Sequence, residues 1–295
     1  MRVFLTGATG FIGSAIIPEL ISAGHQVIGL ARSDAGAKSL VAAGAQVHRG
    51  DLEDLESLRA GAAISDGVIH CAFNHDFSQY AANCEADRHA IEALGSALVG
   101  SDRPFVVTSG TAVVLAPGRL ATEDDAPISS SAGIPRSASE EAAASMLSRG
   151  VRVTVMRLPQ VHDRVKQGLV TPLIDAARAK RVSAYVGDGR NRWPAAHVRD
   201  TARLYRLALE KGEAGARYHA VAEEGVALRD IAAAIGRRLN LPVVAKSAEE
   251  VAGHFGWLGM FVGFDAPASS ALTQQRLGWR PTQPGLIADL DHLES

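Results

Sequence analysis

The stretch FLTGATGFIGSAI, Phe4 to Ile16, decides the fold of this chain. It begins as an apolar strand, passes through Gly7, Gly10 and Gly13 in the spacing GxxGxxG, and continues as an apolar-faced helix. The first glycine suits a tight turn, the second leaves room for a diphosphate, and the third lets the helix pack closely on the strand. A diphosphate would rest against the unpaired N–H groups at the helix N-terminus. A strand before this motif and a helix after it predict a dinucleotide-binding loop.

Outward from this loop, short β-rich runs alternate with helix-length segments. The strand-like runs are RVFLT, QVIGLA, AQVHRGD, GVIHCA, PFVVTS and VRVTVMRL. Parallel strands need crossovers of this length, so the alternation predicts an α/β fold with a Rossmann-type, doubly wound parallel sheet. We expect an NAD(P)-binding domain over 1–158 with a returning segment near 196–221, and a smaller, discontinuous C-terminal substrate lobe over 159–295.

The composition is that of an ordinary globular protein: 295 residues, 47% apolar, with a formal net charge of −2. This balance does not indicate the basic surface that nucleic-acid binding needs, although it leaves a local basic patch open, and no apolar run approaches the ~20 residues that a membrane span needs. Cys71 and Cys84 are too few and too irregularly spaced for a disulfide framework or a CxxC metal site. We therefore expect a cytoplasmic protein with no metal and with neither nucleic acid nor membrane as a partner.

The end of the second strand bears on the choice of cofactor. A carboxylate at this point would bond the ribose hydroxyls of NAD, but the chain has Ala31 followed by Arg32 and Ser33. Arg32 can form a charge-assisted contact with the 2′-phosphate of NADP, so we expect NADP(H) in preference to NAD(H). An exposed arginine after a strand is also a common solvated residue, and Asp34 keeps NAD(H) open.

With these motifs in order, the chain resembles the extended and atypical short-chain dehydrogenases/reductases, including the NAD(P)-dependent epimerase/dehydratase group. The resemblance lies in TGATGFIG, GDLED, VIHCAF, VVTSGTAVV, VRVTVMRLPQVH and AAHVRD, in that order. It implies that the cofactor also contacts residues of the loop and of the third, fourth and fifth strand ends, namely Thr9, Phe11, Ile12, Asp51, Leu52, Cys71, Ala72, Phe73 and Thr108.

The chain departs from the Ser/Thr, Tyr and Lys that carry the chemistry of that family. The segment PRSASEEAA, 135–143, places Arg136 at the tyrosine position and Glu140 at the lysine position. The serine position falls on Gly110, flanked by Ser109 and Thr111. None of the four tyrosines is followed by a lysine four residues later. The usual proton donor is therefore not carried over.

Arg136 offers a different kind of help. A guanidinium stays protonated at every usable pH, so it cannot act as an acid or base, but it can stabilise a developing alkoxide or enolate. Glu140, four residues on, would share a helix face with Arg136. This spacing predicts either a pair that holds the guanidinium in a catalytic position or a plain structural salt bridge.

Several other residues are candidates for the site. His75 follows the fourth strand and His162 the sixth, and each is either a titrating group near the nicotinamide or a solvated loop residue. Thr111 would orient a substrate carbonyl or bond the backbone. The stretch GRNRWPAAHV suggests substrate contacts from Arg192, Trp193 and His197, with Trp193 as a lid or as an anchor for the small lobe. The aromatic-rich HFGWLGMFVGF, 254–264, suits an apolar substrate wall, a dimer contact or small-lobe core.

These residues lead us to expect an NADP(H)-dependent oxidoreductase that acts on a small carbonyl, enone or quinone-like substrate. Such an acceptor stabilises its own negative charge and needs less from a protein acid. Two alternatives stay open: an NADP(H)-binding sensor that has lost catalysis, and a sugar-nucleotide epimerase or dehydratase. A small molecule is the expected partner, and a homodimer is compatible with the sequence.

Overall fold

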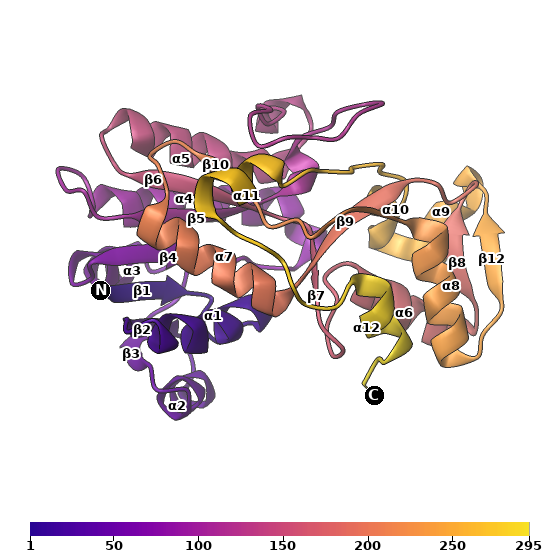
Figure 1. Cartoon of the computed structure of the whole chain (residues 1–295), viewed down its shortest axis with the longest axis horizontal. Helices are drawn as coiled ribbons and strands as arrows, with labels where there is room; N and C mark the ends of the chain where they lie inside the picture. Colours follow the sequence, from indigo (N-terminus) through magenta and orange to yellow (C-terminus); the bar gives the residue numbers. More distant parts are fainter. Residues whose placement is uncertain (295) are drawn as a thin grey trace.

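A computed structural model describes residues 1–294, and its centre is a seven-stranded parallel sheet (Figure 1). The strand order is β10-β6-β5-β4-β1-β2-β3, and every neighbouring pair runs parallel. The strands are β1 (Arg2–Thr6), β2 (Gln26–Ala31), β3 (Gln46–Arg49), β4 (Gly67–His70), β5 (Phe105–Gly110), β6 (Val153–Leu158) and β10 (Arg217–His219). The predicted Rossmann-type, doubly wound sheet is confirmed.

Helices cover both faces of this sheet, so its strands are apolar on both sides. One layer holds α1 (Phe11–Ser22), α2 (Asp34–Ala42) and α7 (Val198–Lys211), whose buried side chains share a core with residues of β1 and β2. The other layer holds α3 (Leu55–Ala63), α4 (Tyr80–Ser96) and α5 (Ala138–Ser148). Because all sheet strands are parallel, their carboxyl ends meet at one edge, where ligands bind in folds of this kind.

A smaller lobe has its own sheets and its own core. β7 (Gln160–His162), β9 (Arg192–His197) and β11 (Glu223–Ala227) form one sheet, and β8 (Ser183–Val186) pairs with β12 (Val243–Lys246). The helices of this lobe are α6 (Val170–Lys180), α8 (Leu228–Leu239), α9 (Val251–Phe255), α10 (Gly259–Val262) and α12 (Leu286–Asp291). Their apolar faces close around a separate cluster that includes Trp193 and Ile231.

The chain crosses between the lobes more often than the sequence indicated. Within the expected returning segment, α7 packs on α1 and β10 pairs with β6. A second return lies further on: α11 (Ala271–Leu277) lies against β10, and the Trp279 indole is fully buried in the large-lobe core, where its N–H donates to the Asp200 carbonyl at 3.0 Å. Figure 1 shows this yellow segment beside α7 before the chain runs on to α12.

The elements at the carboxyl edge of the large sheet form the candidate site. Two short 3₁₀ helices follow strands of this sheet, η1 (Phe77–Gln79) after β4 and η2 (Thr111–Val113) after β5, and a third, η4 (Pro135–Ser137), directly precedes α5. A further turn, η6 (Gly256–Leu258), joins α9 to α10 in the small lobe. Among residues 1–294, no helix is long and apolar enough to cross a membrane.

Candidate active site

The glycine-rich loop has the geometry that its spacing predicted. Gly7 has a φ of +68°, and a Cβ there would lie 2.7 Å from the backbone nitrogen of Ala72. A Cβ at Gly13 would collide with the Gly7 carbonyl, so this glycine lets α1 pack against the loop. Gly10 begins α1 with no side-chain cap, which leaves N–H groups of the first turn unpaired. Thr9 and Phe11 lie beside these groups in sequence, and Ile12 packs on the core. The loop fits a bound diphosphate.

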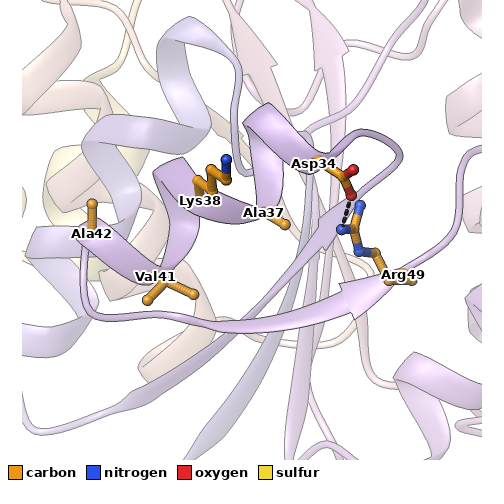
Figure 2. Close-up of a pocket in the computed structure, with 6 residues that line it drawn as sticks. All are labelled: Asp34, Ala37, Lys38, Val41, Ala42 and Arg49. Carbon is orange, nitrogen blue, oxygen red and sulfur yellow. Dashed lines mark hydrogen bonds and ion pairs between the residues drawn. The ribbon is translucent and has the colours of Figure 1, made fainter.

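The end of β2 presents a cation without a counter-charge. The Ser33 hydroxyl caps α2 by accepting from the Gly36 N–H at 3.1 Å, whereas Arg32 is exposed and has no carboxylate partner among residues 1–294. Figure 2 shows the residues that line a pocket along α2 and at the end of β3, among them Asp34, which is paired with Arg49. Asp34 is therefore occupied by a protein cation, while Arg32 remains available.

Residues after β3 and β4 complete this edge of the sheet. The Asp51 carboxylate accepts from the Glu53 N–H at 2.8 Å, and Leu52 packs on the core beneath α3. The Ala72 N–H donates to Thr6 Oγ1 at 3.3 Å. Burial raises the pKa of the neighbouring Cys71 thiol to about 11, and the hydrogen bond that this thiol donates to the Tyr205 hydroxyl opposes the rise. The Cys71 side chain is therefore an uncharged thiol at neutral pH.

Thr108 lies on β5 below this edge. Its hydroxyl is within 2.6 Å of both the His70 carbonyl and the Tyr205 hydroxyl, and the side chain is buried. Thr108 was expected among the cofactor contacts, but its hydroxyl instead joins β5 to β4 and α7. Any cofactor contact from Thr108 would have to come from its backbone.

Arg136 stands at the carboxyl end of β5 and is held on several sides. One terminal nitrogen donates to Asp87 Oδ2 at 2.7 Å and contacts the Ser139 hydroxyl, and the other donates to the Thr108 carbonyl at 3.0 Å. The guanidinium carbon lies 4.3 Å from the centre of the Phe73 ring, which allows a cation–π contact. The side chain keeps 14% of its surface exposed. The cation is thus fixed at the edge where substrates of this fold bind.

Asp87, on α4, is the anchor of Arg136. Its carboxylate is 2% exposed and accepts from Ser139 Oγ at 2.5 Å and from His70 Nε2 at 2.9 Å, in addition to Arg136. Burial opposes ionisation, but the Arg136 charge and the His70 contact together hold the pKa of Asp87 well below its usual range. The carboxylate is therefore ionised wherever the protein is folded near neutral pH.

A hydrogen-bonded chain extends from Asp87 to the cofactor loop. His70 Nδ1 lies 2.8 Å from Thr6 Oγ1, and that hydroxyl accepts from the Ala72 N–H. His70 contacts Asp87 through Nε2 and Thr6 through Nδ1, so both ring nitrogens have a hydrogen-bond partner. The chain links the anchor of Arg136 to the residue that overlies Gly7.

The expected pair between Arg136 and Glu140 is wrong. Glu140 is 2% exposed and binds Arg157 through both carboxylate oxygens, at 2.7 and 2.8 Å, and it also lies 3.3 Å from Arg217. The reason is local: Arg136 belongs to the 3₁₀ turn η4, and α5 begins only at Ala138, so the two residues do not stand one α-turn apart. Glu140 serves a buried ion pair between α5, β6 and β10.

The two hydroxyls beside Gly110 are both buried. Thr111 Oγ1 donates to the Leu158 carbonyl at 3.4 Å, which corresponds to the backbone-bonding alternative for this residue. Ser109 Oγ has no hydrogen-bond partner among residues 1–294. Neither hydroxyl contacts Arg136, so the structure does not bring the flanking Ser/Thr and the arginine together.

The three candidate histidines have different surroundings. His75 is exposed, lies 5.3 Å from Phe73 between ring centres, and has its pKa lowered by the atoms packed around it and by the Arg136 and Lys166 charges. His162 is fully buried and its Nδ1 lies 2.8 Å from Asp289 of α12. His197 caps α7, where Nδ1 accepts from the Arg199 N–H at 3.1 Å. Only His75 lies near Arg136.

Trp193 and Arg192 do not face the Arg136 site. Trp193 is 3% exposed within the small-lobe core, so its interpretation as a lid is wrong and its role is that of the anchor. Side chains alternate along β9, and this one points inward among α6, α8 and α12 residues. Arg192 points the other way and is paired with Asp265 at 2.9 Å on the surface.

Asp87 and His70 belong to the site although no sequence motif indicated them. One signal was present: α4 buries a stripe that includes Cys84, Asp87, Ile91 and Leu94, and a carboxylate on an apolar stripe must find a cation. The spacing of residues along the sequence did not predict that this cation would be Arg136. Among residues 1–294, no group of three or more His, Cys, Asp or Glu side chains is arranged to hold a metal ion.

Comparisons with known proteins agree with this geometry. The sequence profile of the NAD dependent epimerase/dehydratase family matches residues 3–222. An uncharacterised protein of Schizosaccharomyces pombe is 50% identical over 98% of both chains. A 4-hydroxy-2-methyl-3-oxo-4-farnesyl-3,4-dihydroquinoline-1-oxide ketoreductase of Stigmatella aurantiaca is 29% identical over 91% of this chain and 84% of its own. The crystal structure of a dTDP-glucose 4,6-dehydratase of Streptomyces venezuelae with NAD superposes with a TM-score of 0.78 at 20% identity, covering 98% and 96% of the two chains.

The fold and the glycine-rich loop together define a nicotinamide-dependent enzyme with a Rossmann-type domain. The profile match covers well over half of the chain. This protein belongs to the NAD-dependent epimerase/dehydratase family, within the extended short-chain dehydrogenases/reductases.

Proposed function

We propose that this protein is an NADP(H)-dependent oxidoreductase that reduces a small carbonyl, enone or quinone-like substrate, with Arg136 stabilising the negative charge on the substrate oxygen. The observation that carries the proposal is the fixed position of Arg136 at the carboxyl edge of the sheet. Asp87 and the Thr108 carbonyl hold its two terminal nitrogens, and Phe73 lies against its face. A preorganised cation of this kind stabilises a transition state without reorganising during the reaction.

Arg136 has donors to spare for a substrate. A guanidinium has five N–H groups, and the contacts with Asp87, Ser139 and the Thr108 carbonyl use three of them. Two N–H groups therefore remain for an oxyanion, and the side chain is partly exposed. The bound cofactor would supply a hydride to the carbonyl or ring carbon, and the resulting oxyanion would take its proton from water. A substrate that delocalises this charge fits a site without a tyrosine.

Preference for NADP(H) is supported by the charges at the end of β2. Arg32 is exposed and unpaired, whereas the nearby Asp34, the carboxylate that would favour NAD, is tied to Arg49. A free guanidinium suits bidentate contact with a 2′-phosphate.

The arginines near the lobe boundary give less support to a sugar-nucleotide substrate. A diphosphate needs unpaired basic groups, but Arg192 is paired with Asp265 and Arg190 lies 3.6 Å from Asp188. The named substrate of the Stigmatella relative carries a ketone on a fused ring, which is closer to the class proposed here.

The test begins with NADPH binding, followed by fluorescence, and continues with NADPH oxidation against quinones, enones, aldehydes and a UDP-sugar. We expect one carbonyl or quinone class to be turned over. Arg136→Met keeps the length of the side chain and removes its charge, and we expect it to lower kcat by about 100-fold. NADPH affinity should change less than about twofold, because Arg136 itself contacts no residue of the glycine-rich loop.

Arg192→Met is the matched control, because it removes an arginine of an exposed ion pair outside the Arg136 site. It should leave kcat unchanged. Tight NADPH binding with no turnover of any class would favour the cofactor-sensing alternative. Turnover that survives Arg136→Met would refute the assigned role of Arg136 while keeping the oxidoreductase.

A further inference from the structure

The aromatic stretch 254–264 is only partly used by the small-lobe core. Phe255, Leu258 and Val262 are buried there at 7, 2 and 0% exposure. Trp257 and Met260, by contrast, are 41% and 47% exposed. The alternation follows from the short turns of α9, η6 and α10, which turn one set of side chains inward and another outward. Packing in the small-lobe core therefore accounts for the buried side chains of this stretch, but it does not account for the exposed ones.

The outer rings contact the other lobe. The Trp257 ring stacks on Phe77 with centres 4.5 Å apart and an interplanar angle of 6°. Phe261 meets the same cluster edge-on, 5.6 Å from Phe77 and 6.1 Å from Tyr80. We call these four residues, Phe77, Tyr80, Trp257 and Phe261, the aromatic gate. Two of them come from the segment after β4 and two from the small lobe.

The aromatic gate leads directly to Arg136. Tyr80 lies 6.5 Å from the Phe73 ring, and Phe73 is the ring that lies against the guanidinium of Arg136. A continuous series of rings thus runs from the exposed Trp257 to the cation at the sheet edge. None of these rings carries a charge, and burial raises the pKa of Tyr80 to about 12, so its hydroxyl stays protonated.

We propose that the aromatic gate binds the planar aromatic part of the substrate between Phe77 and Trp257 and directs its carbonyl oxygen toward Arg136. The inference rests on the proposed function and narrows its substrate to aromatic carbonyls and quinones. Phe77 and Trp257 come from separate lobes, so their parallel rings can move apart and admit a third ring between them. Each of the two rings then stacks on the inserted ring instead of on the other, in the offset-stacked arrangement that aromatic rings prefer. The Arg136 guanidinium, which lies 4.3 Å from the centre of the Phe73 ring, favours an electron-rich oxygen at the inner end.

Trp257 makes this site directly measurable. Trp193 and Trp279 are buried at 3% and 0% exposure, so Trp257 is the tryptophan that a ligand at the gate would quench. The probe is 2-methyl-1,4-naphthoquinone, added to the full-length protein saturated with NADP⁺ so that no turnover occurs. We expect saturable quenching in the wild type, absent in Trp257→Phe. The non-planar cyclohexane-1,4-dione should bind at least about tenfold more weakly.

Affinity is measured in parallel by calorimetry in two leucine variants. Phe77→Leu removes one face of the stack, and we expect it to weaken naphthoquinone binding at least about fivefold. Phe264→Leu is the matched control, because it makes the same substitution at a ring that contacts Phe261 and not Phe77; it should stay within about twofold of the wild type. Far-UV circular dichroism of each variant is the check that it is folded.

Quenching that rises linearly with naphthoquinone, or equal affinity in Phe77→Leu and the wild type, overturns the proposal. This outcome is distinct from failure of the proposed function. Saturable, Phe77-dependent binding without NADPH oxidation would keep the aromatic site and refute the oxidoreductase. Turnover with an unchanged KM in Phe77→Leu would keep the oxidoreductase and refute the gate.

Discussion

Replacing Asp87 by asparagine removes the charge that anchors Arg136 with almost no change in size. Asp87 accepts hydrogen bonds from Arg136, Ser139 and His70 in a setting where it is only 2% exposed. Asparagine keeps one acceptor oxygen but puts an NH₂ group where the carboxylate received donors. The variant therefore leaves the guanidinium without its counter-charge and at least one of the donors without an acceptor.

The size of the effect follows from the burial of the pair. Removing one partner of a buried ion pair costs about 3–5 kcal/mol. Arg136 is 14% exposed and can turn partly toward water, which reduces this loss. We therefore expect Asp87→Asn to lower the free energy of unfolding by about 2–4 kcal/mol. The same variant should reduce kcat with the best substrate, because the cation is no longer held in place.

Urea unfolding of Asp87→Asn, Arg136→Met and the double variant measures this directly. The two residues should be coupled by about 1–3 kcal/mol, since each side chain loses its partner in either single variant. Asp265→Asn breaks the exposed pair with Arg192 and is the control, with an expected loss below about 1 kcal/mol. Additive effects, or a loss for Asp87→Asn no larger than for Asp265→Asn, would refute the reasoning.

The pH dependence gives an independent check on Asp87. Its pKa is lowered in the folded state, so its contribution is complete above the ordinary pKa of 3.8 and is lost as the pH falls below that value. The difference in unfolding free energy between the wild type and Asp87→Asn should therefore be constant from neutral pH down to about 5 and shrink below about 4. A difference that stays constant through acid pH would show that Asp87 is not a charged anchor.

Three further predictions concern the cofactor site and the thiols. Gly7→Ala should weaken NADPH binding at least about tenfold in a fluorescence titration, because Gly7 has a φ of +68° and the added Cβ would lie 2.7 Å from a backbone nitrogen. Its control is Gly24→Ala, where φ is +82° but the Cβ would enter open space, and this variant should only lower stability. Arg32→Ala should weaken NADPH binding about tenfold and leave NADH binding unchanged, and equal effects on both cofactors would refute the 2′-phosphate contact. Burial raises the thiol pKa values of Cys71 and Cys84 from 9.0 to about 11. Both thiols should therefore react with Ellman's reagent about 100-fold more slowly in the folded protein than in denaturant. Fast labelling of the native protein would contradict this.

The sequence by itself determined the fold class and the cofactor loop. Gly7, Gly10 and Gly13 carry their meaning in local spacing, because a tight turn and the start of a helix involve only neighbouring residues. The alternation of strand and helix runs likewise fixed a doubly wound parallel sheet, since parallel strands require crossovers. The same alternation placed the ends of β2, β3 and β4 at one edge, and the departure from Tyr and Lys at Arg136 and Glu140 was visible without coordinates.

Only the tertiary structure decided which residues act on one another there. Glu140 is close to Arg136 in sequence, yet it binds Arg157, whereas Arg136 binds Asp87 from another helix. Phe77 and Trp257 meet although 179 residues of chain lie between them. Partner choice in these cases depends on how helices and lobes pack, and the 3₁₀ turn before α5 shows how a single local distortion redirects a side chain. Helical periodicity can say that a charged residue lies on a buried stripe, but the counter-charge comes from an element that periodicity does not place.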